Sequence, residues 1–524
     1  VKVQNKAISR FDKLDLYFLI FILTFFVVSL FLLNTPPTAD EGTHSLIALF
    51  FRDLFRDLAK YPTFSFSDIY DYTISYLVHY PKLSLYYPPL LHVTTSFFLG
   101  FLEVSFFTAR LVVLLFSIGT LLVMYKTIGK FFSKKLALLV TVLFSIMPMI
   151  YYNSITMMTD IPYMFFFMAA MFFYLTALDS KRIPHFILAA IFTSLAFLTK
   201  WNSILILPII FVYVLLEKRA LVKHFIISAL LVLLIISPYL LIVWKAGLIT
   251  LPYISSLQTS ATAKQDPQFT SVQGWIYYSN VLSKQYFTIP LLIASLGALI
   301  LYSIKREKYW KLFVIWFLTY YIAFTVLSNK EPRYMMPLVP TLLIPLSVFI
   351  LSQKTKISVP LMVISISLVA FTTAQLVSST YYYNPDLLKI AKETLNDGGN
   401  ILVAAEPSWF YSSQFIFTLA SLDENLSKFV YRSCSLSSTS LEDLSSIYGV
   451  NYIIVPEPTD RDSDNVVLVR SSPDFVLEKE FQRDTTKISL FVSNTSSQKQ
   501  YCNFICVLNK TICSNHRVPI EAFK

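Results

Sequence analysis

The sequence predicts a polytopic α-helical membrane protein of about eleven transmembrane helices, followed by a small C-terminal extracytoplasmic α/β domain. Three observations predict this fold class. The 524-residue chain is 55% hydrophobic and only 14% charged, with a mean hydropathy of +0.59, whereas soluble domains carry about 25% charged residues. Eleven runs contain no formal charge at all, and basic residues gather in alternate connections between these runs.

The uncharged runs approach the length of about 20 residues that a helix needs to cross the hydrocarbon core. The runs 183–199 and 201–216 are short for a full crossing. The complete set is 16–33, 111–125, 136–152, 161–178, 183–199, 201–216, 225–244, 286–304, 312–328, 334–353 and 357–380.

A twelfth apolar segment, 88–102, is short, begins with two prolines and contains His92. Suppose that this segment lies in the membrane interface and that the N-terminus is cytoplasmic. The cytoplasmic connections then hold 19 basic and five acidic residues, whereas the opposite side of the membrane part holds eleven basic and ten acidic residues. A crossing at 88–102 would invert most of this bias, against the positive-inside rule. We therefore expect a multi-pass plasma-membrane protein with its N-terminus in the cytoplasm and its C-terminal domain outside.

The formal charge of +11 does not indicate nucleic acid as a partner. The first 380 residues carry a net charge of +15 and the remainder carries −4. Because the excess belongs to the membrane part, its usual cause is orientation in the bilayer.

We predict two domains, a membrane domain over 1–380 and a soluble domain over 381–524. The membrane domain has two long outer connections, 34–105 and 245–285, and the second is long enough to suggest a functional lid or binding loop. In the soluble domain, Asn400–Ala405 and Asn451–Pro456 are typical of buried strands, and Leu441–Tyr448 between them is helix-like. All four cysteines lie here and are disulfide candidates, with three pairings open or unpaired thiols as the alternative: Cys434, Cys502, Cys506 and Cys513.

The connection 34–105 contains a predicted amphipathic helix in the headgroup plane. Its apolar residues recur at steps of three and four, and its charged residues lie on the other side of the helix. The apolar set is Leu46, Leu49, Phe50, Leu54 and Leu58, and the charged set is Arg52, Asp53, Arg56 and Asp57.

Ionisable residues collect at the outer membrane edge, where an unpaired charge is unfavourable unless it has a function. Separately, Asp40 and Asp160 could be helix caps, and Lys200 and Arg333 could be snorkelling side chains. Their convergence on one side favours a shared polar site. Its members are Asp40 and Glu41 after the first run, Arg110, Asp160, Lys200 with Trp201, and Lys330 to Tyr334.

Six short motifs follow one another along the chain: Asp40-Glu41, Tyr87–Leu90, Arg110-Leu111, Asp160–Pro162, Lys200-Trp201 and Lys330–Pro337. In this order they resemble the motifs of the GT-C membrane glycosyltransferases. They resemble most the branch of dolichyl-phosphate-mannose protein mannosyltransferases and lipid A aminoarabinose transferases. The resemblance covers about residues 35–340 and implies the GT-C fold, a polyprenyl- or dolichyl-phosphate sugar donor, inversion at the anomeric carbon and an extracytoplasmic active site.

The chain departs from this family at one place. In the aminoarabinose transferases a Glu-Lys pair precedes the two prolines, and its lysine contacts lipid phosphate, but Tyr86 and Tyr87 stand here. Another cation must therefore bind the donor phosphate, and the candidates are Arg333, Lys330, Lys264, Lys82 and Arg110. Tyr87, Lys200, Trp201 and Tyr334 are candidate substrate-binding residues. The Trp-Trp-Asp-Tyr-Gly signature of oligosaccharyltransferases is absent.

We assign the general base to Asp40, because the acceptor hydroxyl needs one and a positioned carboxylate contributes about 10²–10⁴-fold. Asp160 would orient the acceptor or stabilise an oxocarbenium-like carbon, and Glu41 ranks third for either role. Because inversion places the base and the leaving phosphate on opposite faces of the sugar, they should come from separate loops. No cofactor is required. Carboxylates and water would suit Mg²⁺ or Mn²⁺, but His44, His79 and His92 match no metal motif.

The sequence leaves several alternatives open. The sugar, with mannose or a similar hexose favoured, and the acceptor, a glycan, a lipid or a protein, are not separated. A transporter of lipid-linked or sugar substrates is the alternative from another class. A transporter should carry polar groups inside its spans near the bilayer midplane, whereas these spans are almost free of charge.

Overall fold

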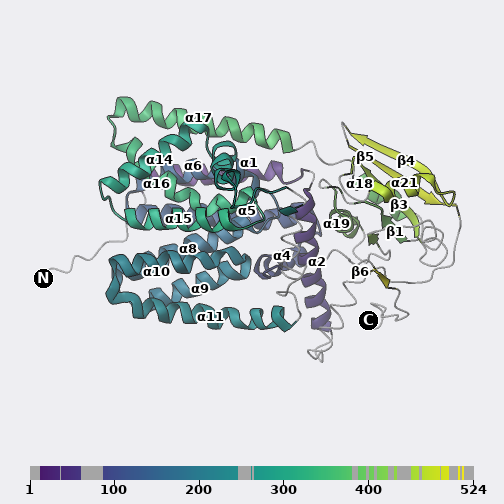
Figure 1. Cartoon of the computed structure of the whole chain (residues 1–524), viewed down its shortest axis with the longest axis horizontal. Coiled ribbons are helices and arrows are strands. Elements are labelled where there is room, and N and C mark those ends of the chain that lie inside the picture. Colours follow the sequence, from purple (N-terminus) through teal and green to yellow (C-terminus); the bar gives the residue numbers. More distant parts are fainter. Residues whose placement is uncertain are drawn as a thin grey trace.

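The structure is a computed structural model that describes residues 12–60, 87–245, 261–380 and 387–512, with short gaps. A bundle of long helices lies beside a small sheet domain, and α2 (Ala39–Lys60) crosses the end of the bundle that faces the sheet (Figure 1). The gaps are at residues 36, 263–264, 397–399, 406, 408–409, 423–429, 433–449, 460–462, 484–485, 495–504 and 508–509.

The helices of the bundle follow the predicted uncharged runs, and successive long helices reverse direction. Their bounds are α1 (Lys13–Leu32), α5 (Phe106–Phe131), α6 (Lys134–Ser145), α7 (Pro148–Ser154), α8 (Asp160–Ser180), α9 (Ile183–Thr199), η1 (Trp201–Leu205), α10 (Ile206–Glu217), η2 (Arg219–Leu221), α11 (Val222–Lys245), α13 (Val272–Val281), η3 (Leu282–Tyr286), α14 (Ile289–Ile304), α15 (Trp310–Val326), η4 (Pro332–Leu338), α16 (Val339–Ser352) and α17 (Thr355–Thr380).

The predicted class of polytopic helical membrane protein is confirmed. Among the described residues, six helices are long and apolar enough to cross a membrane, or up to eight if each of two bent helix pairs is one span. The bent pairs are α6 with α7, at 76°, and 272–286 with α14, at 116°. Shorter apolar helices occupy the remaining predicted runs, at α9, at η1 with α10, and at α15. The number of eleven crossings stays a prediction.

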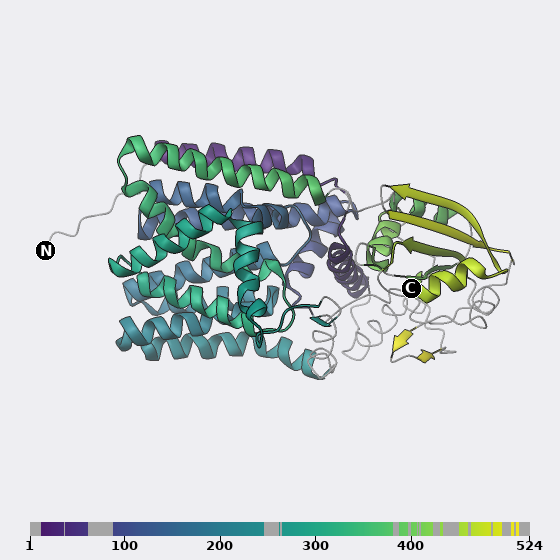
Figure 2. The same cartoon turned by 45° about the horizontal axis from the view of Figure 1, so that its top comes forward.

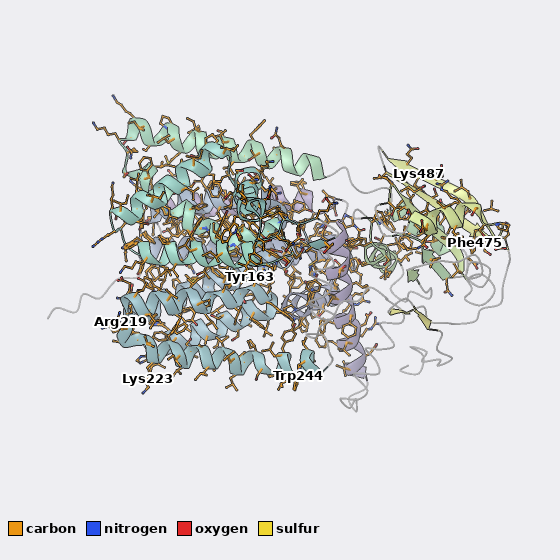
Figure 3. All side chains as sticks on the ribbon, in the orientation of Figure 1. Tyr163, Arg219, Lys223, Trp244, Phe475 and Lys487 are labelled. Carbon is orange, nitrogen blue, oxygen red and sulfur yellow. The ribbon has the colours of Figure 1, made fainter. Side chains whose placement is uncertain are left out.

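The basic connections expected in the cytoplasm meet at one end of the bundle. Lys308, before α15, donates a hydrogen bond of 3.1 Å to the carbonyl of Phe131 at the end of α5. Figure 3 places Arg219 and Lys223 at the end of the bundle away from the sheet domain, and Trp244 at the end toward it. Arg219, Lys223 and Lys308 therefore lie on the connections at one end of the bundle, and the orientation of that end in the membrane stays a prediction.

The predicted amphipathic helix is α2, which packs against α4 (Leu90–Phe101). Its expected apolar face is buried, including Leu46 and Leu49. Two residues of the predicted charged face, Arg52 and Asp53, are also buried. They form an ion pair of 2.8 Å, and this pairing permits two charges to leave water together.

The C-terminal domain is a mixed five-stranded sheet of order β2-β1-β3-β5-β4, in which β1 pairs parallel with β2 and β3, and β5 pairs antiparallel with β3 and β4. Both predicted strands are present, as β1 and β3, while the predicted helix 441–448 lies outside the described residues. The elements are α18 (Leu387–Asn396), β1 (Asn400–Val403), α19 (Ser412–Leu422), β2 (Val430–Arg432), β3 (Val450–Glu457), α21 (Ser463–Ser471), β4 (Phe475–Arg483), β5 (Thr486–Ser493), β6 (Ile505–Val507) and β7 (Lys510–Ile512).

The C-terminal domain contacts the membrane domain through α19, which packs against α2 (Figures 1 and 2). Phe417 of α19 also packs against Phe106 at the start of α5, with ring centroids 4.6 Å apart. The helix that carries Asp40 and Glu41 therefore lies between the bundle and the soluble domain. Helix α17 ends at Thr380 and α18 starts at Leu387, and the division into two domains near residue 380 stays a prediction.

Candidate active site

Four predicted site residues from four different segments form one ion-pair network at the end of the bundle next to α2. Asp40, in the first turn of α2, accepts a 3.0 Å hydrogen bond from Nη2 of Arg333 in η4. Asp160, the first residue of α8, accepts a 2.6 Å bond from Nζ of Lys200, which follows α9. Arg333 links the two pairs, because its Nε lies 4.0 Å from Oδ2 of Asp160. Segments separated by up to 293 residues therefore meet in one place, as the sequence argument predicted.

The two carboxylates of this network differ in access to solvent. The side chain of Asp40 is 50% exposed and that of Asp160 is 3% exposed. Asp40 therefore has room to accept a proton from an incoming group, whereas Asp160 presents a fixed charge.

Two facing atoms of the network have unused hydrogen-bonding capacity. Oδ2 of Asp160 and Nε of Arg333 are both buried, and neither has a hydrogen-bond partner among the described residues. A buried polar atom without a partner is unfavourable by about 1–3 kcal/mol. Its presence at a site is therefore explained if a ligand or a water molecule completes the bonds.

Lys200 is held between its carboxylate partner and an aromatic ring. Its ammonium lies 5.3 Å from the ring centroid of Tyr334, within the range of a cation–π contact. Desolvation lowers the pKa of Lys200, and the charge of Asp160 opposes this shift. The indole of Trp201 does not join the network: its Nε1 donates a 3.0 Å hydrogen bond to the hydroxyl of Tyr239. Of the expected substrate-binding residues, Lys200 and Tyr334 are the two that contact the network or each other.

Glu41 and Arg110 form a separate, fully buried clamp. Nε and Nη2 of Arg110 donate to the two carboxylate oxygens of Glu41 at 2.7 and 2.8 Å. The backbone N–H groups of Thr38 and Met157 donate to the same carboxylate at 2.7 and 2.8 Å. Glu41 is 0% and Arg110 is 1% exposed. Both groups hold the start of α2 through these bonds, so the contacts favour a structural part for Glu41 and Arg110, and the catalytic and phosphate-binding roles expected for them stay predictions.

Lys330 is also committed elsewhere. Its ammonium donates to the carbonyls of Phe324 and Leu327, at 3.0 and 2.7 Å, and to that of Thr325. These carbonyls belong to the last turn of α15 and to the residue that follows it, where the helix leaves carbonyls unpaired. Lys330 is 2% exposed, so these contacts favour the part of a helix cap, and its expected role as a phosphate ligand stays a prediction.

His44, one helical turn after Asp40 in α2, forms a buried pair with His92. The two histidines were treated as unrelated in the sequence analysis. Nδ1 of His44 is 2.9 Å from Nε2 of His92, and Nδ1 of His92 is 3.2 Å from the carbonyl oxygen of Pro88. Burial lowers the pKa of His92 to about 4 and that of His44 well below its usual value. The ring of Tyr87 lies 4.8 Å from that of His44 in an edge-on arrangement. The spacing of four residues between Asp40 and His44 was the available signal, since it places both on one face of α2.

Some predicted residues cannot be placed. Lys82, Lys264, Cys434, Cys502 and Cys513 lie outside the described residues, and Cys506 is described only as part of the strand β6. Within the described part of the chain, no group of three His, Cys, Asp or Glu side chains could hold a metal ion.

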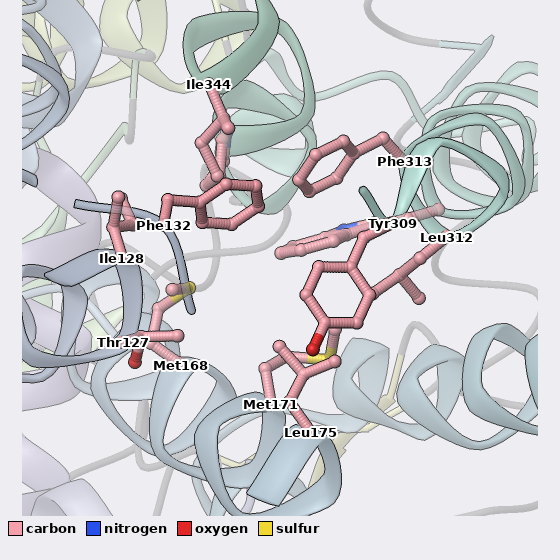
Figure 4. Close-up of a pocket in the computed structure, with 12 residues that line it drawn as sticks. Thr127, Ile128, Phe132, Met168, Met171, Leu175, Tyr309, Leu312, Phe313 and Ile344 are labelled. Carbon is pink, nitrogen blue, oxygen red and sulfur yellow. The ribbon is translucent and has the colours of Figure 1, made fainter. Parts of the chain in front are cut away.

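A cavity inside the bundle lies at the opposite end from the carboxylates. It has a volume of about 30 Å³, and its walls are formed by α5, α8, α15 and α16, with Phe132, Tyr309 and Phe313 around it (Figure 4). A cavity of this size holds about one or two water molecules. It is too small for a sugar and lies away from the charged network.

Part of the chain is similar to a known protein family. Residues 87–244 match the family model described as dolichyl-phosphate-mannose-protein mannosyltransferase. A comparison with curated protein sequences gives no match.

Solved structures of similar fold cover nearly the whole chain. ArnT from Cupriavidus metallidurans bound to undecaprenyl phosphate is 14% identical with a TM-score of 0.66, over 93% of this chain and 99% of that one. Its apo structure gives 14% identity and a TM-score of 0.64, over 91% and 97%. The oligosaccharyltransferase from Archaeoglobus fulgidus, tethered with an acceptor peptide, gives 10% identity and a TM-score of 0.51, over 91% and 74%. The predicted GT-C fold and the predicted enzyme class, a glycosyltransferase, are therefore confirmed.

Proposed function

We propose that this membrane glycosyltransferase of the GT-C fold moves a sugar from a polyprenyl-phosphate or dolichyl-phosphate donor to an extracytoplasmic acceptor hydroxyl. The observation that carries the proposal is the network of Asp40, Arg333 and Asp160 at one end of the bundle. The undecaprenyl phosphate bound to ArnT and the dolichyl-phosphate-mannose family model support a lipid-phosphate donor. A hexose such as mannose is the favoured sugar, and the acceptor is a glycan, a lipid or a protein.

In the proposed reaction, the oxygen of the acceptor hydroxyl forms a bond to the anomeric carbon while the bond from that carbon to the phosphate oxygen breaks. The bonding electron pair leaves with the polyprenyl phosphate, and the hydroxyl proton passes to the carboxylate of Asp40. Because the second pKa of a phosphomonoester is about 6, the leaving group needs electrostatic stabilisation more than a proton.

Arg333 is the described cation best suited to the donor phosphate. Lys330 and Arg110 use their donors in hydrogen bonds within the protein. Nε of Arg333 makes no hydrogen bond among the described residues and has only long ion-pair contacts to Asp160 and Glu331, and its Nη1 makes only a weak 3.8 Å contact to the sulfur of Met158. A guanidinium matches two phosphate oxygens at once. In this structure Arg333 bonds directly to Asp40, whereas from the sequence we expect the general base and the phosphate-binding cation to come from separate loops on opposite faces of the sugar. We infer that the donor phosphate takes over Arg333 and releases the oxygen of Asp40 for the acceptor.

Asp160 would then stabilise positive charge on the sugar carbon. It is almost fully buried and its position is fixed by Lys200. A fixed charge in a site that excludes water stabilises a developing opposite charge without reorganisation.

The test is transfer by the purified protein from radiolabelled polyprenyl-phosphate mannose, glucose and pentose, with membrane extract as the source of acceptor. Asp40→Asn should lower the turnover at least 10²-fold, and Glu103→Gln, which changes an exposed carboxylate in the loop before α5, should match the wild type. Transfer from a nucleotide sugar, with none from any lipid-phosphate donor, would refute the proposal.

The proposal also requires the site to face the outside of the plasma membrane, with the N-terminus in the cytoplasm. In a variant whose four native cysteines are changed to serine, a membrane-impermeant thiol reagent should label a cysteine introduced at Glu103 in intact cells and should not label one introduced at Lys223. The reverse pattern would place the site in the cytoplasm.

A further inference from the structure

Two residues of α2, directly after the carboxylates, face the C-terminal domain. Asp40 and Glu41 bond to cations of the bundle, whereas Gly42 and Thr43 contact α19. A single turn of helix is thus held from both sides. The C-terminal domain therefore contacts the candidate catalytic turn itself.

Gly42 and Gln414 are in backbone-to-backbone contact. A Cβ atom at position 42 would lie 2.4 Å from the backbone nitrogen of Gln414 and 2.6 Å from its Cα. Real Cβ contacts essentially never reach such distances, and a backbone cannot swing away as a long side chain can. Any side chain at position 42 must therefore displace α19 or shift α2.

Polar contacts surround this close approach. The side chain of Gln414 is completely buried, and its Nε2 donates a 3.0 Å hydrogen bond to the carbonyl of Pro37, just before α2. Its Oε1 accepts a 2.9 Å bond from the backbone N–H of Tyr411. The hydroxyls of Thr43 and Ser413 lie 3.2 Å apart. The chain entering α2 and the first turn of α2 are both fixed to the C-terminal domain.

We propose that the C-terminal domain holds the first turn of α2 in its catalytic position, with Gly42 and Gln414 as the positioning residues. The proposal rests on the function proposed above, because Asp40 is the group that is positioned. A misplacement of about 1 Å in a reacting group can lower a rate about 10²-fold. A shift of this turn would move Asp40 relative to Arg333, which belongs to the bundle and does not follow α2.

Two glycine substitutions form a matched pair that tests the contact. Gly42→Ala introduces the clash, whereas Gly100→Ala, in α4, adds a methyl group with nothing within 4 Å. We expect Gly42→Ala to lower kcat about 10²-fold with an unchanged KM for the donor, and Gly100→Ala to match the wild type. Gln414→Ala removes the bond to Pro37 without a clash and should lower kcat about tenfold while the protein stays folded. Equal kcat in Gly42→Ala and Gly100→Ala would overturn the proposal.

A cross-link separates positioning from an opening motion of the domain. In the double variant Thr43→Cys and Ser413→Cys, a disulfide would hold α19 on α2. We expect the oxidised protein to keep the kcat of its reduced form, with the disulfide verified by mass spectrometry. Loss of activity on oxidation and recovery with reductant would show that the domain must leave α2, which contradicts the proposal.

A readout independent of activity distinguishes this inference from the proposed function. In Asp40→Cys protein, the rate of modification by a soluble thiol reagent reports the exposure of this turn. Adding Gly42→Ala should change that rate severalfold, and adding Gly100→Ala should not. A changed rate in a protein that transfers from no lipid-phosphate donor would refute the proposed function alone, and an unchanged rate would refute the positioning role.

Discussion

The adjacent carboxylates of Asp40 and Glu41 should respond in opposite ways to the loss of their charge. The carboxylate of Glu41 accepts four hydrogen bonds in a site without exposure to solvent. Glu41→Gln replaces one acceptor by a donor and leaves the guanidinium of Arg110, 1% exposed, without its counter-ion. Breaking such a buried pair destabilises a protein by about 3–5 kcal/mol. Asp40 is half exposed and makes one ion pair with Arg333, so Asp40→Asn should lower stability by less than about 1 kcal/mol.

The assay compares both variants in detergent, with thermal unfolding followed by the remaining monomer on size exclusion and with sugar transfer measured on the folded fraction. Asp40→Asn should unfold with the wild type and transfer at least 10²-fold more slowly. Glu41→Gln should unfold at a clearly lower temperature, and its surviving folded fraction should keep activity. Glu41→Leu combined with Arg110→Met removes both buried charges and should recover part of the stability. A Glu41→Gln protein of normal stability and no activity would refute the assignment, since Glu41 would then be the reacting carboxylate.

Three further outcomes follow from the described contacts. Burial holds the pKa of His92 at about 4, below its unfolded value of about 6.5, so between these pH values the unfolded chain binds a proton that the folded chain does not. The contribution of His92 to stability should therefore fall by about 1.4 kcal/mol per pH unit from pH 6.5 to 4, in addition to the contribution of His44, whose pKa burial also lowers. His92→Gln should remove this part of the slope in denaturation midpoints. Lys330→Met should destabilise the protein by about 1–3 kcal/mol with an unchanged donor KM, and a tenfold higher KM would instead make Lys330 a phosphate ligand. Arg333→Lys keeps the charge but loses the planar fork, so transfer should fall at least tenfold with normal unfolding, and full activity would exclude a bidentate phosphate contact.

The membrane fold was predictable because hydrocarbon imposes strong constraints on sequence. A span must be apolar over nearly its whole length, so the boundaries of α8 (Asp160–Ser180) and α17 (Thr355–Thr380) fall close to the predicted runs. The bends between α6 and α7 were not predictable in this way. A break of a few residues leaves the hydropathy of the run unchanged, and only packing against neighbours determines the angle of 76°.

The members of the charged network were predictable, but their roles were not. Charge at the membrane edge identified Asp160, Lys200 and Arg333, since such residues are seldom placed there without function. The sequence could not show that Glu41 and Lys330 are saturated with hydrogen bonds, because their partners come from other segments or depend on the exact end of a helix. The histidine pair was missed for the same reason, as its members are 48 positions apart.

Unsatisfied hydrogen-bonding capacity distinguishes the candidate active site from the structural charges around it. The carboxylate of Glu41 and the ammonium of Lys330 are buried with all their strong bonds made within the protein. Oδ2 of Asp160 and Nε of Arg333 are equally buried, yet neither has a partner in the described part of the chain. Folding alone would favour pairing these atoms as well, because an unpaired buried group is unfavourable. The two atoms lie 4.0 Å apart, and under the proposed function polar atoms of the substrate would supply the missing bonds.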